Sequence, residues 1–190
     1  MKKKIVIAGV DEVGRGCLAG PVVSAAVVLK EGINLKLLKD SKKISFKKRL
    51  EISDHIKSHS HYAIGLASVE EILDLNILQA SLLSMKRALE QLTVKPDLTL
   101  IDGNFAPSGL KNCKTIINGD EKIKVISAAS IVAKVYRDNL MIKLSQEFSN
   151  YAWESNFGYG TKAHLEGLKK FGITSHHRKG FKPIHKILSN

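Results

Sequence analysis

The chain has 190 residues, of which 44 % are hydrophobic and 25 % are charged, the proportions of an ordinary globular domain. A chain of this length can bury a full core without disulfides or a structural metal. Lysine and arginine (30) outnumber the acids (18), so the formal net charge is +12. This excess favours nucleic acid or an anionic membrane surface as partner, although a generally basic proteome would also produce it.

The sequence excludes several other classes of protein. Cys17 and Cys113 are too few and too far apart for a disulfide framework or a zinc-finger spacing. Asp11 and Glu12 interrupt the first apolar run before a signal sequence could form. No stretch approaches the ~18 consecutive apolar residues of a transmembrane helix. We therefore expect a cytoplasmic protein with no membrane segment.

In chain order, the first elements are two strands, a loop, a helix and a third strand. Apolar, β-branched runs over 4–10 and 22–29 are typical of buried strands, and a glycine-rich segment separates them. A polar, lysine-rich loop follows over 30–44. Ser45 is a suitable N-cap for a helix that reaches about residue 57, and the run over 62–67 predicts a third strand.

The next helical region begins with a capping box. Ser68 and Glu71 have the required spacing, and the helix is expected to restart near Asn76 and to end by Pro96. One face of this helix should pack on a sheet because its apolar residues recur at steps of four and three: Leu78, Leu82, Met85, Leu89 and Leu92.

The second half contains shorter strands and a long helix. A fourth strand over 98–101 leads to Asp102, and a fifth over 114–117 leads to Asp120. A helix is expected from about 125 to 148, with inward positions at Ala129, Val132, Val135 or Tyr136, and Leu140. A helix over about 161–171 and a basic stretch over 176–186 complete the chain. Early antiparallel and later parallel pairing predict a mixed sheet flanked by helices.

Four carboxylates stand at or beside breaks in these elements: Asp11, Glu12, Asp102 and Asp120. Taken singly, each also fits a solvated strand end or a turn. Together they would repel one another unless a cation held them, and Mg²⁺ and Mn²⁺ prefer oxygen ligands of this kind. Ligands of open α/β sheets bind at the carboxyl ends of strands. A metal site inside a basic protein indicates phosphodiester chemistry.

One feature of this set conflicts with regular strand geometry. Successive strand residues point to opposite faces, so Asp11 and Glu12 cannot both point inward from a regular strand. Either the chain bends there, as Gly14 and Gly16 would permit, or the longer side chain of Glu12 reaches round.

The ordered motifs resemble bacterial ribonuclease HII. They span residues 9–183 and read GVDEVGRGCLAGPVVSAAVVL, DSKK, LIDGN, NGD followed by ISAASIVAKVYRD, GYGTKAH and HRKGFKPI. The resemblance implies the ribonuclease H-like fold, with a five-stranded mixed sheet flanked by helices. It implies one catalytic domain over 1–190, in which residues from about 150 to 190 form a helical, basic C-terminal extension.

The resemblance also implies a reaction and the residues that perform it. The enzyme would cleave the RNA strand of RNA–DNA hybrids and nick 5′ of single ribonucleotides in duplex DNA, leaving 5′-phosphate and 3′-hydroxyl ends. Two Mg²⁺ or Mn²⁺ ions would be held by the acidic set Asp11, Glu12, Asp102 and Asp120, with Asp11 between them. The ribonucleotide would contact the segment Gly14, Arg15 and Gly16, and the following sugar would pack on Tyr159.

Two positions depart from the family pattern. Tyr136 stands where threonine is common, and Gly180 stands where serine is common, which puts a side-chain contact to phosphate at that point in doubt.

Basic residues are the remaining candidates for contacts to the substrate. Phosphate contacts, which position a nucleic acid without reading its sequence, are expected from Lys42, Lys43, Arg178 and Lys182. The run Lys47-Lys48-Arg49 is more typical of a solvated helix face. His176 and His177 are expected to contact phosphate or solvent rather than a metal.

Two other functions stay open. One is a ribonuclease H-like DNA nuclease of resolvase type, and the other is a non-catalytic hybrid-binding module. The acids disfavour the module, because a pure binder gains nothing from negative charge facing phosphates. We expect a monomer, since no helix shows a second apolar stripe.

Overall fold

The computed structural model describes residues 5–38 and 45–189. In this part of the chain, five strands form one sheet: β1 (Ile7–Val13), β2 (Val22–Leu29), β3 (Ser60–Ala67), β4 (Leu98–Asp102) and β5 (Cys113–Ile116). Their order across the sheet is β3-β2-β1-β4-β5. The first three strands pair antiparallel, and β4 pairs parallel with both β1 and β5. The predicted five-stranded mixed sheet is confirmed.

The first strand lies three residues further along the sequence than its apolar run suggested. It continues to Val13, so Asp11 and Glu12 lie inside the strand, opposite Ala25 and Ser24 of β2. The predicted end at residue 10 was wrong because it relied on hydrophobicity alone. Cross-strand hydrogen bonds satisfy the backbone whatever the side chain, so the ladder continues through the two acids.

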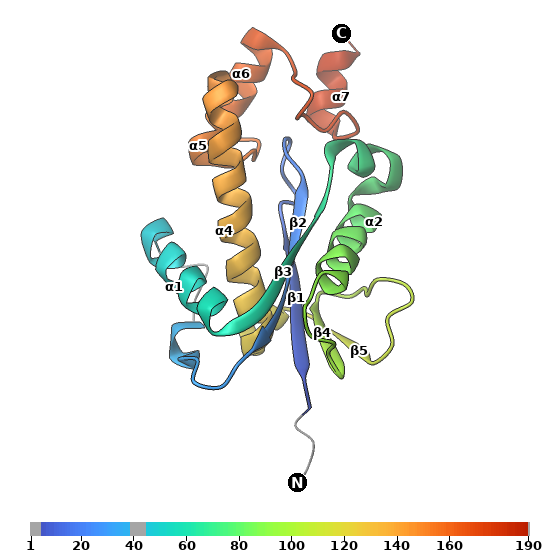
Figure 1. The fold of residues 1–190 in the computed structure, drawn as a ribbon. Helices are drawn as coiled ribbons and strands as arrows, with labels where there is room; N and C mark the ends of the chain where they lie inside the picture. The colour runs from blue at the N-terminus through green and yellow to red at the C-terminus, as the bar shows by residue number, and fades with distance from the viewer. Residues whose placement is uncertain (1–4, 39–44, 190) are drawn as a thin grey trace.

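Helices cover both faces of the sheet (Figure 1). On one face lie α1 (Phe46–Ser58) and α4 (Lys124–Glu147), where α4 packs on β1 and β2. On the other face lies α2 (Val69–Glu90), which packs on β2 and β3. None of the helices in the described part of the chain has the length and apolar character needed to cross a lipid bilayer.

The predicted capping signals are confirmed. The Ser45 side chain accepts a hydrogen bond from the Lys48 N–H at the start of α1. Ser68 and Glu71 form both hydrogen bonds of a capping box at the start of α2. Inside α2, Asn76 has φ 68° and ψ 164°, so the helix is interrupted there and restarts, as the sequence predicted.

Short helices complete the chain: η1 (Leu35–Leu38), α3 (Gly119–Lys122), η2 (Ser149–Tyr151), α5 (Trp153–Asn156), α6 (Lys162–Phe171) and α7 (Lys182–Leu188). Of these, α6 was predicted and α3, α5 and α7 were not, because periodicity is hard to recognise in so few residues. The C-terminal helices pack around Trp153 in a cluster that includes Leu18 and Met141. This cluster joins the C-terminal part to α4 and to the segment after β1.

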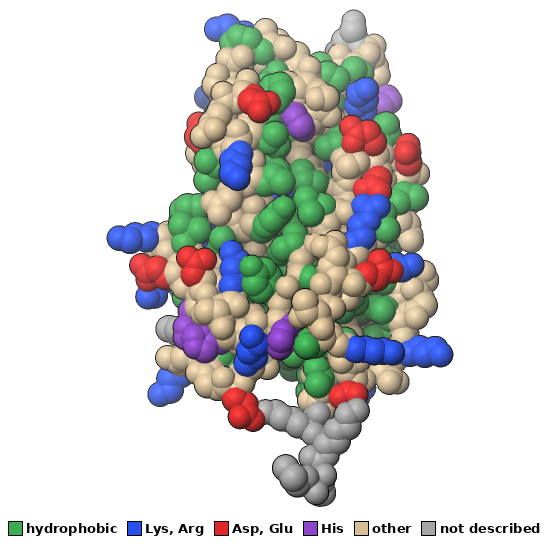
Figure 2. Space-filling model, in the orientation of Figure 1, with side chains coloured by type: hydrophobic (Ala, Val, Ile, Leu, Met, Phe, Trp, Pro, Cys, Tyr) green, Lys and Arg blue, Asp and Glu red, His purple; other side chains and the backbone are tan. Residues whose placement is uncertain are grey.

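The face that carries the free edge of β3 shows a band of hydrophobic side chains between α4 and α2 (Figure 2). Basic and acidic side chains are scattered on both sides of this band. The positive charge of the protein is therefore not concentrated on this face.

Candidate active site

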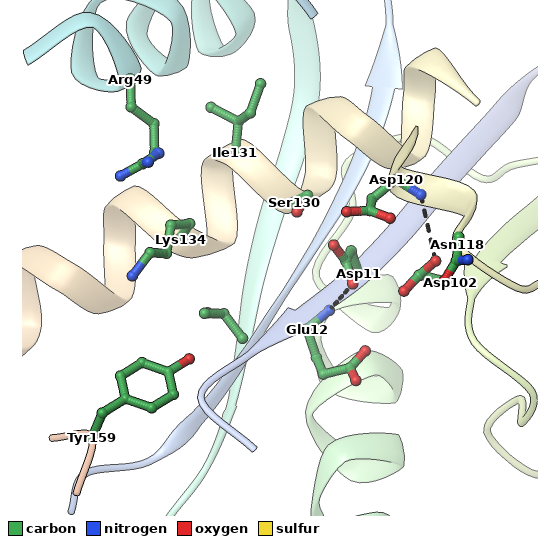
Figure 3. Close-up of a pocket in the computed structure, with 11 residues that line it drawn as sticks. Asp11, Glu12, Arg49, Asp102, Asn118, Asp120, Ser130, Ile131, Lys134 and Tyr159 are labelled. Atoms are coloured by element: carbon green, nitrogen blue, oxygen red, sulfur yellow. Dashed lines mark hydrogen bonds between the residues drawn. The ribbon is translucent and has the colours of Figure 1, made fainter. Parts of the chain in front are cut away.

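The four predicted carboxylates line one cavity of about 410 Å³ (Figure 3). Asp11 and Glu12 come from β1, Asp102 is the last residue of the adjacent parallel strand β4, and Asp120 lies on α3, just after β5. Neighbouring strands and the connection after β5 thus bring the four side chains together, as the pattern of acids after hydrophobic strands predicted.

Asp11 lies in surroundings that oppose its negative charge. The residue is only 5 % exposed, and its Oδ1 accepts a hydrogen bond from the Glu12 N–H at 2.7 Å. Burial raises the pKa of Asp11 well above its ordinary value, and the charges of Glu12 and Asp102 raise it further. A bound cation would offset this cost.

Glu12 reaches the cavity without a bend in the chain. The strand stays paired with β2 through Val13, and Figure 3 shows the Glu12 side chain leaving β1 in a different direction from Asp11. Of the two predicted alternatives, a bend in the chain or a long side chain that reaches the cavity, the second therefore applies to Glu12. Glu12 Oε1 accepts a hydrogen bond from Arg15 Nη1 at 3.3 Å. Its Oε2 is buried and has no hydrogen-bond partner among the described residues.

Asp102 organises the segment that carries Asp120. Its Oδ1 accepts hydrogen bonds from the Gly119 N–H at 2.6 Å and the Asp120 N–H at 3.4 Å. These are orphan donors at the first turn of α3. A Cβ at Gly119 would lie 2.7 Å from Ile126 Cδ1 and 3.3 Å from Asp102 Oδ1, so a larger residue would require these side chains to move. The NGD motif is therefore held against the end of β4.

The donor set suits a hard divalent metal. The described residues contain no group of three His, Cys, Asp or Glu side chains already arranged as a complete ligand cluster. The cavity nevertheless offers four carboxylates, including the unpartnered Oε2 of Glu12. Burial also raises the pKa of Glu12, although Arg15 acts in the opposite direction. Carboxylate oxygens whose negative charge is unfavourable in the metal-free protein are suitable ligands for Mg²⁺ or Mn²⁺.

The predicted substrate-binding segment borders the cavity. Gly14 has φ 94°, and a Cβ there would collide with the Arg137 guanidinium, so this position requires glycine on two counts. A Cβ on Gly16 would lie 4.0 Å from Tyr159 Cε1, which places the Tyr159 ring beside the segment. Tyr159 is 40 % exposed and lines the cavity. Burial raises the pKa of its hydroxyl, so the group stays protonated.

Arg178 supports this segment from behind. The side chain is only 1 % exposed, and it donates from Nε to the Gly20 carbonyl and from Nη1 to the Arg15 carbonyl, both at 2.9 Å. The expected phosphate contact of Arg178 does not match this burial, because a guanidinium so enclosed does not face the cavity. Its role in the structure is to fix the backbone of the glycine segment.

Arg137 has a similar position that the sequence did not reveal. It is fully buried and donates to the backbone carbonyls of Ala19, Pro21 and Phe157 at 2.7–3.0 Å. The only signal was a charged residue on the inward side of a long helix. Buried arginines of this kind are hydrogen-bonded because their desolvation is otherwise costly.

The remaining basic candidates lie elsewhere. Lys182 is exposed at the start of α7 and does not line the cavity. Lys42 and Lys43 lie outside the described residues. The two departures from the family pattern, Tyr136 and Gly180, are both exposed, and neither lines the cavity.

His177 is a core residue, contrary to the expected contact with phosphate or solvent. It is fully buried, and its Nδ1 accepts a hydrogen bond from the Thr174 N–H, so its Nε2–H faces His164 Nε2 at 3.1 Å. His164 Nε2 also accepts from Trp153 Nε1, and His164 Nδ1 contacts the Tyr159 carbonyl. Burial lowers the pKa of His177 to about 4, so the ring is neutral at physiological pH.

Some cavity residues were missed. Asn118, Ser130, Arg49 and Lys134 line the same cavity as the acids. Arg49 belongs to the run that was expected to be a solvated face. Lys47 and Lys48 are indeed exposed, whereas the Arg49 side chain is only 14 % exposed and turns toward α4.

Comparison with known proteins places the chain in a family. A family model for ribonuclease HII matches residues 8–186. The chain belongs to the ribonuclease HII family. It is 58 % identical to the ribonuclease HII of Pelagibacter ubique, over 96 % of this chain and 99 % of that protein. It is 49 % identical to that of Roseobacter denitrificans, over 96 % of this chain and 92 % of that protein.

A solved structure supports the fold. The ribonuclease H2 of Pyrococcus horikoshii superposes with a TM-score of 0.81 at 28 % identity, covering 97 % of this chain and 98 % of that one. As a ribonuclease HII, the protein is an endoribonuclease that acts on the RNA of RNA–DNA hybrids and gives 5′-phosphate products. The predicted family, fold and enzyme class are confirmed.

Proposed function

We propose that the protein is a metal-dependent nuclease that also nicks duplex DNA on the 5′ side of a single embedded ribonucleotide, leaving 5′-phosphate and 3′-hydroxyl ends. The observation that carries this proposal is the meeting of four carboxylates in one cavity bordered by Tyr159 and the segment 14–16. The net charge of +12 supports a polyanionic substrate.

The metal would be held by the acidic set Asp11, Glu12, Asp102 and Asp120, with Mg²⁺ or Mn²⁺ as the ion and two ions in the substrate complex. When bound, such ions lower the pKa of an attacking water and stabilise charge on the leaving 3′-oxygen. Asp11 would gain the countercharge that its buried position requires. Glu12 Oε2 would gain a partner. Asp102 uses Oδ1 to cap α3 and can offer Oδ2.

Selection of ribose would come from the backbone of residues 14–16. The 2′-hydroxyl is what distinguishes RNA from DNA at a given site, so it must be recognised by hydrogen bonds. Glycine allows the main chain to approach the sugar closely. The segment is kept rigid by Arg178, which holds the Arg15 carbonyl, and by Arg137, which lies against Gly14. Tyr159 would pack on the sugar of the following deoxynucleotide.

Exposed basic side chains would hold the duplex on either side of the cavity. We propose phosphate contacts from Lys42, Lys43 and Lys182, which position the duplex without reading its sequence. The partner would be an RNA–DNA hybrid or a ribonucleotide-containing duplex, bound by a monomer in the cytoplasm.

One assay separates this function from its alternatives. The protein is incubated with Mn²⁺ or Mg²⁺ and a labelled duplex that contains a single ribonucleotide, and the products are sized on a denaturing gel. A nick on the 5′ side of the ribonucleotide supports the proposal. Equal cutting of an all-DNA duplex would instead indicate a resolvase-type nuclease, and binding without cutting would indicate a binding module.

Asp102→Asn tests the role of the carboxylates. We expect cleavage to be abolished while duplex affinity stays within about tenfold, because the variant loses charge but keeps an oxygen that can cap α3. Asp54→Asn is the matched control, since Asp54 is 77 % exposed and does not line the cavity. Unchanged turnover in Asp102→Asn would remove this residue from the proposed site.

A further inference from the structure

The cavity has a basic half as well as an acidic half. Arg49 from α1 and Lys134 from α4 line it together with the four carboxylates. Figure 3 shows these two side chains on the side away from Asp102 and Asp120, and Tyr159 borders the same side. We call Arg49 and Lys134 the cationic pair.

A buried acid contacts both members of the cationic pair. Asp138, on α4, is fully buried. Its Oδ1 lies 2.7 Å from Lys134 Nζ, and its Oδ2 lies 3.9 Å from Arg49 Nη1. Lys134 Nζ also lies 4.7 Å from the centre of the Phe157 ring. The hydrogen bond to Asp138 restrains the Lys134 side chain, so less rotamer freedom is lost when Lys134 binds a ligand.

Both members of the cationic pair are accessible from the cavity. The side chains of Arg49 and Lys134 are still 14 % and 27 % exposed, so part of each remains accessible from the cavity that it lines. A purely structural ion pair that ties α1 to α4 would need no opening to the cavity.

We propose that Arg49 and Lys134 form a phosphate-binding subsite for the cleaved strand, on the Tyr159 side of the scissile bond. This inference rests on the proposed function, because it assumes that a nucleic-acid strand crosses the cavity. Four carboxylates repel the phosphates of such a strand. A guanidinium fork and an ammonium group next to them are suited to bind the neighbouring phosphate.

The salt dependence of binding tests the subsite. Affinity for the single-ribonucleotide duplex is measured by fluorescence anisotropy at several KCl concentrations with Mg²⁺ present, in the Asp102→Asn background so that no strand is cut. Each lost phosphate contact reduces the slope of log K against log [salt] by about 1. We expect this reduction in Lys134→Met and in Arg49→Met, with affinity weakened about fivefold at moderate salt.

Lys143→Met is the matched control. Lys143 is exposed on the same helix, and nine residues at about 100° each place it on the side opposite Lys134. The control loses the same charge, so long-range electrostatics are matched, and its slope should equal that of the parent. A parental slope in Lys134→Met, or an equal reduction in Lys143→Met, overturns the subsite.

Two further measurements separate the possible failures. Lys134→Arg keeps the charge, so its slope should equal that of the parent. A reduced slope in Lys134→Arg would show that damaged folding, not the lost charge, reduces the slope, and this would overturn the proposal. The nicking assay on the unmodified protein reports on the proposed function independently. If that protein nicks but the slopes do not differ, the subsite fails alone; if it does not nick, the proposed function fails whatever the slopes.

Discussion

At the scale of single residues, Asp11 combines functional need with an electrostatic cost. It is 5 % exposed, and the neighbouring acids and burial all raise its pKa. Such a carboxylate lowers the stability of the metal-free protein but binds a cation in the active enzyme. This trade-off between stability and activity is common at active sites. The position can therefore be tested through stability as well as through activity.

For Asp11→Asn we expect loss of cleavage together with a more stable metal-free protein. Removing a buried charge that its neighbours repel should raise the Tm in EDTA by about 2–4 °C, which corresponds to on the order of 1 kcal/mol. The asparagine oxygen can still accept from the Glu12 N–H. Calorimetry with and without Mg²⁺ checks this: Mg²⁺ should raise the Tm of the unmodified protein more than that of the variant. A lower Tm of the variant in EDTA would contradict the explanation.

His177 predicts a loss of stability in acid. Its pKa is about 4 in the folded protein and about 6.5 in the unfolded chain, so the unfolded chain binds the proton more tightly. The stability contributed by the neutral ring is fully present above about pH 6.5 and is lost as pH falls toward 4, by up to about 3 kcal/mol. Urea unfolding at a series of pH values measures this.

The variant His177→Gln isolates the contribution of that ring. Other groups titrate in the same range, but they are common to both proteins, so the difference between the two pH profiles belongs to His177 and to His164, which it contacts. The profile of the variant should be flatter between pH 6.5 and 4. Parallel profiles would mean that this histidine pair does not govern acid stability.

At the scale of elements, the interruption of α2 is encoded locally. Asn76 has a positive φ of 68°, and its Oδ1 accepts hydrogen bonds from the Leu78 and Gln79 N–H groups at 3.0 and 3.2 Å. The side chain thus caps the second half of the helix, and asparagine tolerates positive φ better than most residues. The capping hydrogen bonds join residues at most three positions apart, so this interruption is a local feature of the sequence.

We expect Asn76→Ala to destabilise the protein by about 1–2 kcal/mol, because the variant loses the cap and strains the backbone. Asn76→Gly loses the same cap but relieves the strain, so it should cost less. Urea unfolding of the two variants separates the two effects. An alanine variant as stable as the glycine variant would show that the backbone conformation carries no strain.

Elements set by distant contacts were less predictable. The end of β1 depends on its ladder with β2, which extends the strand through Asp11 and Glu12. The four-residue helix α3 exists next to β4 because Asp102 satisfies its first N–H groups from seventeen residues away. Neither signal is contained in the segment itself. Elements marked by local capping and periodicity could therefore be predicted from the sequence. Elements that depend on long-range hydrogen bonds could not.

At the scale of the whole molecule, the C-terminal part shares its core with the rest. Trp153 is fully buried in a cluster with Leu18, from the segment after β1, and Met141, from α4. Arg178 adds hydrogen bonds to the backbone of Arg15 and Gly20. These contacts support the prediction of a single domain over 1–190.

Cooperative unfolding tests that prediction. The sequence contains one tryptophan, so fluorescence reports the C-terminal cluster, whereas circular dichroism at 222 nm reports all helices. We expect the two signals to change at the same urea concentration, as in a two-state domain. An earlier fluorescence transition would show that the region from about 150 to 190 unfolds as a separate unit.

The sequence by itself determined the mixed sheet, the helix caps and the four acids that follow hydrophobic runs, because strand patterns and capping signals are properties of neighbouring residues. Only the tertiary structure decided which charged side chains face the cavity. Arg49 turns inward while Lys47 and Lys48 stay exposed, and Arg178 lies buried 163 residues from the carbonyl that it holds. Burial depends on what the rest of the chain packs against a residue, and composition and spacing do not contain that information.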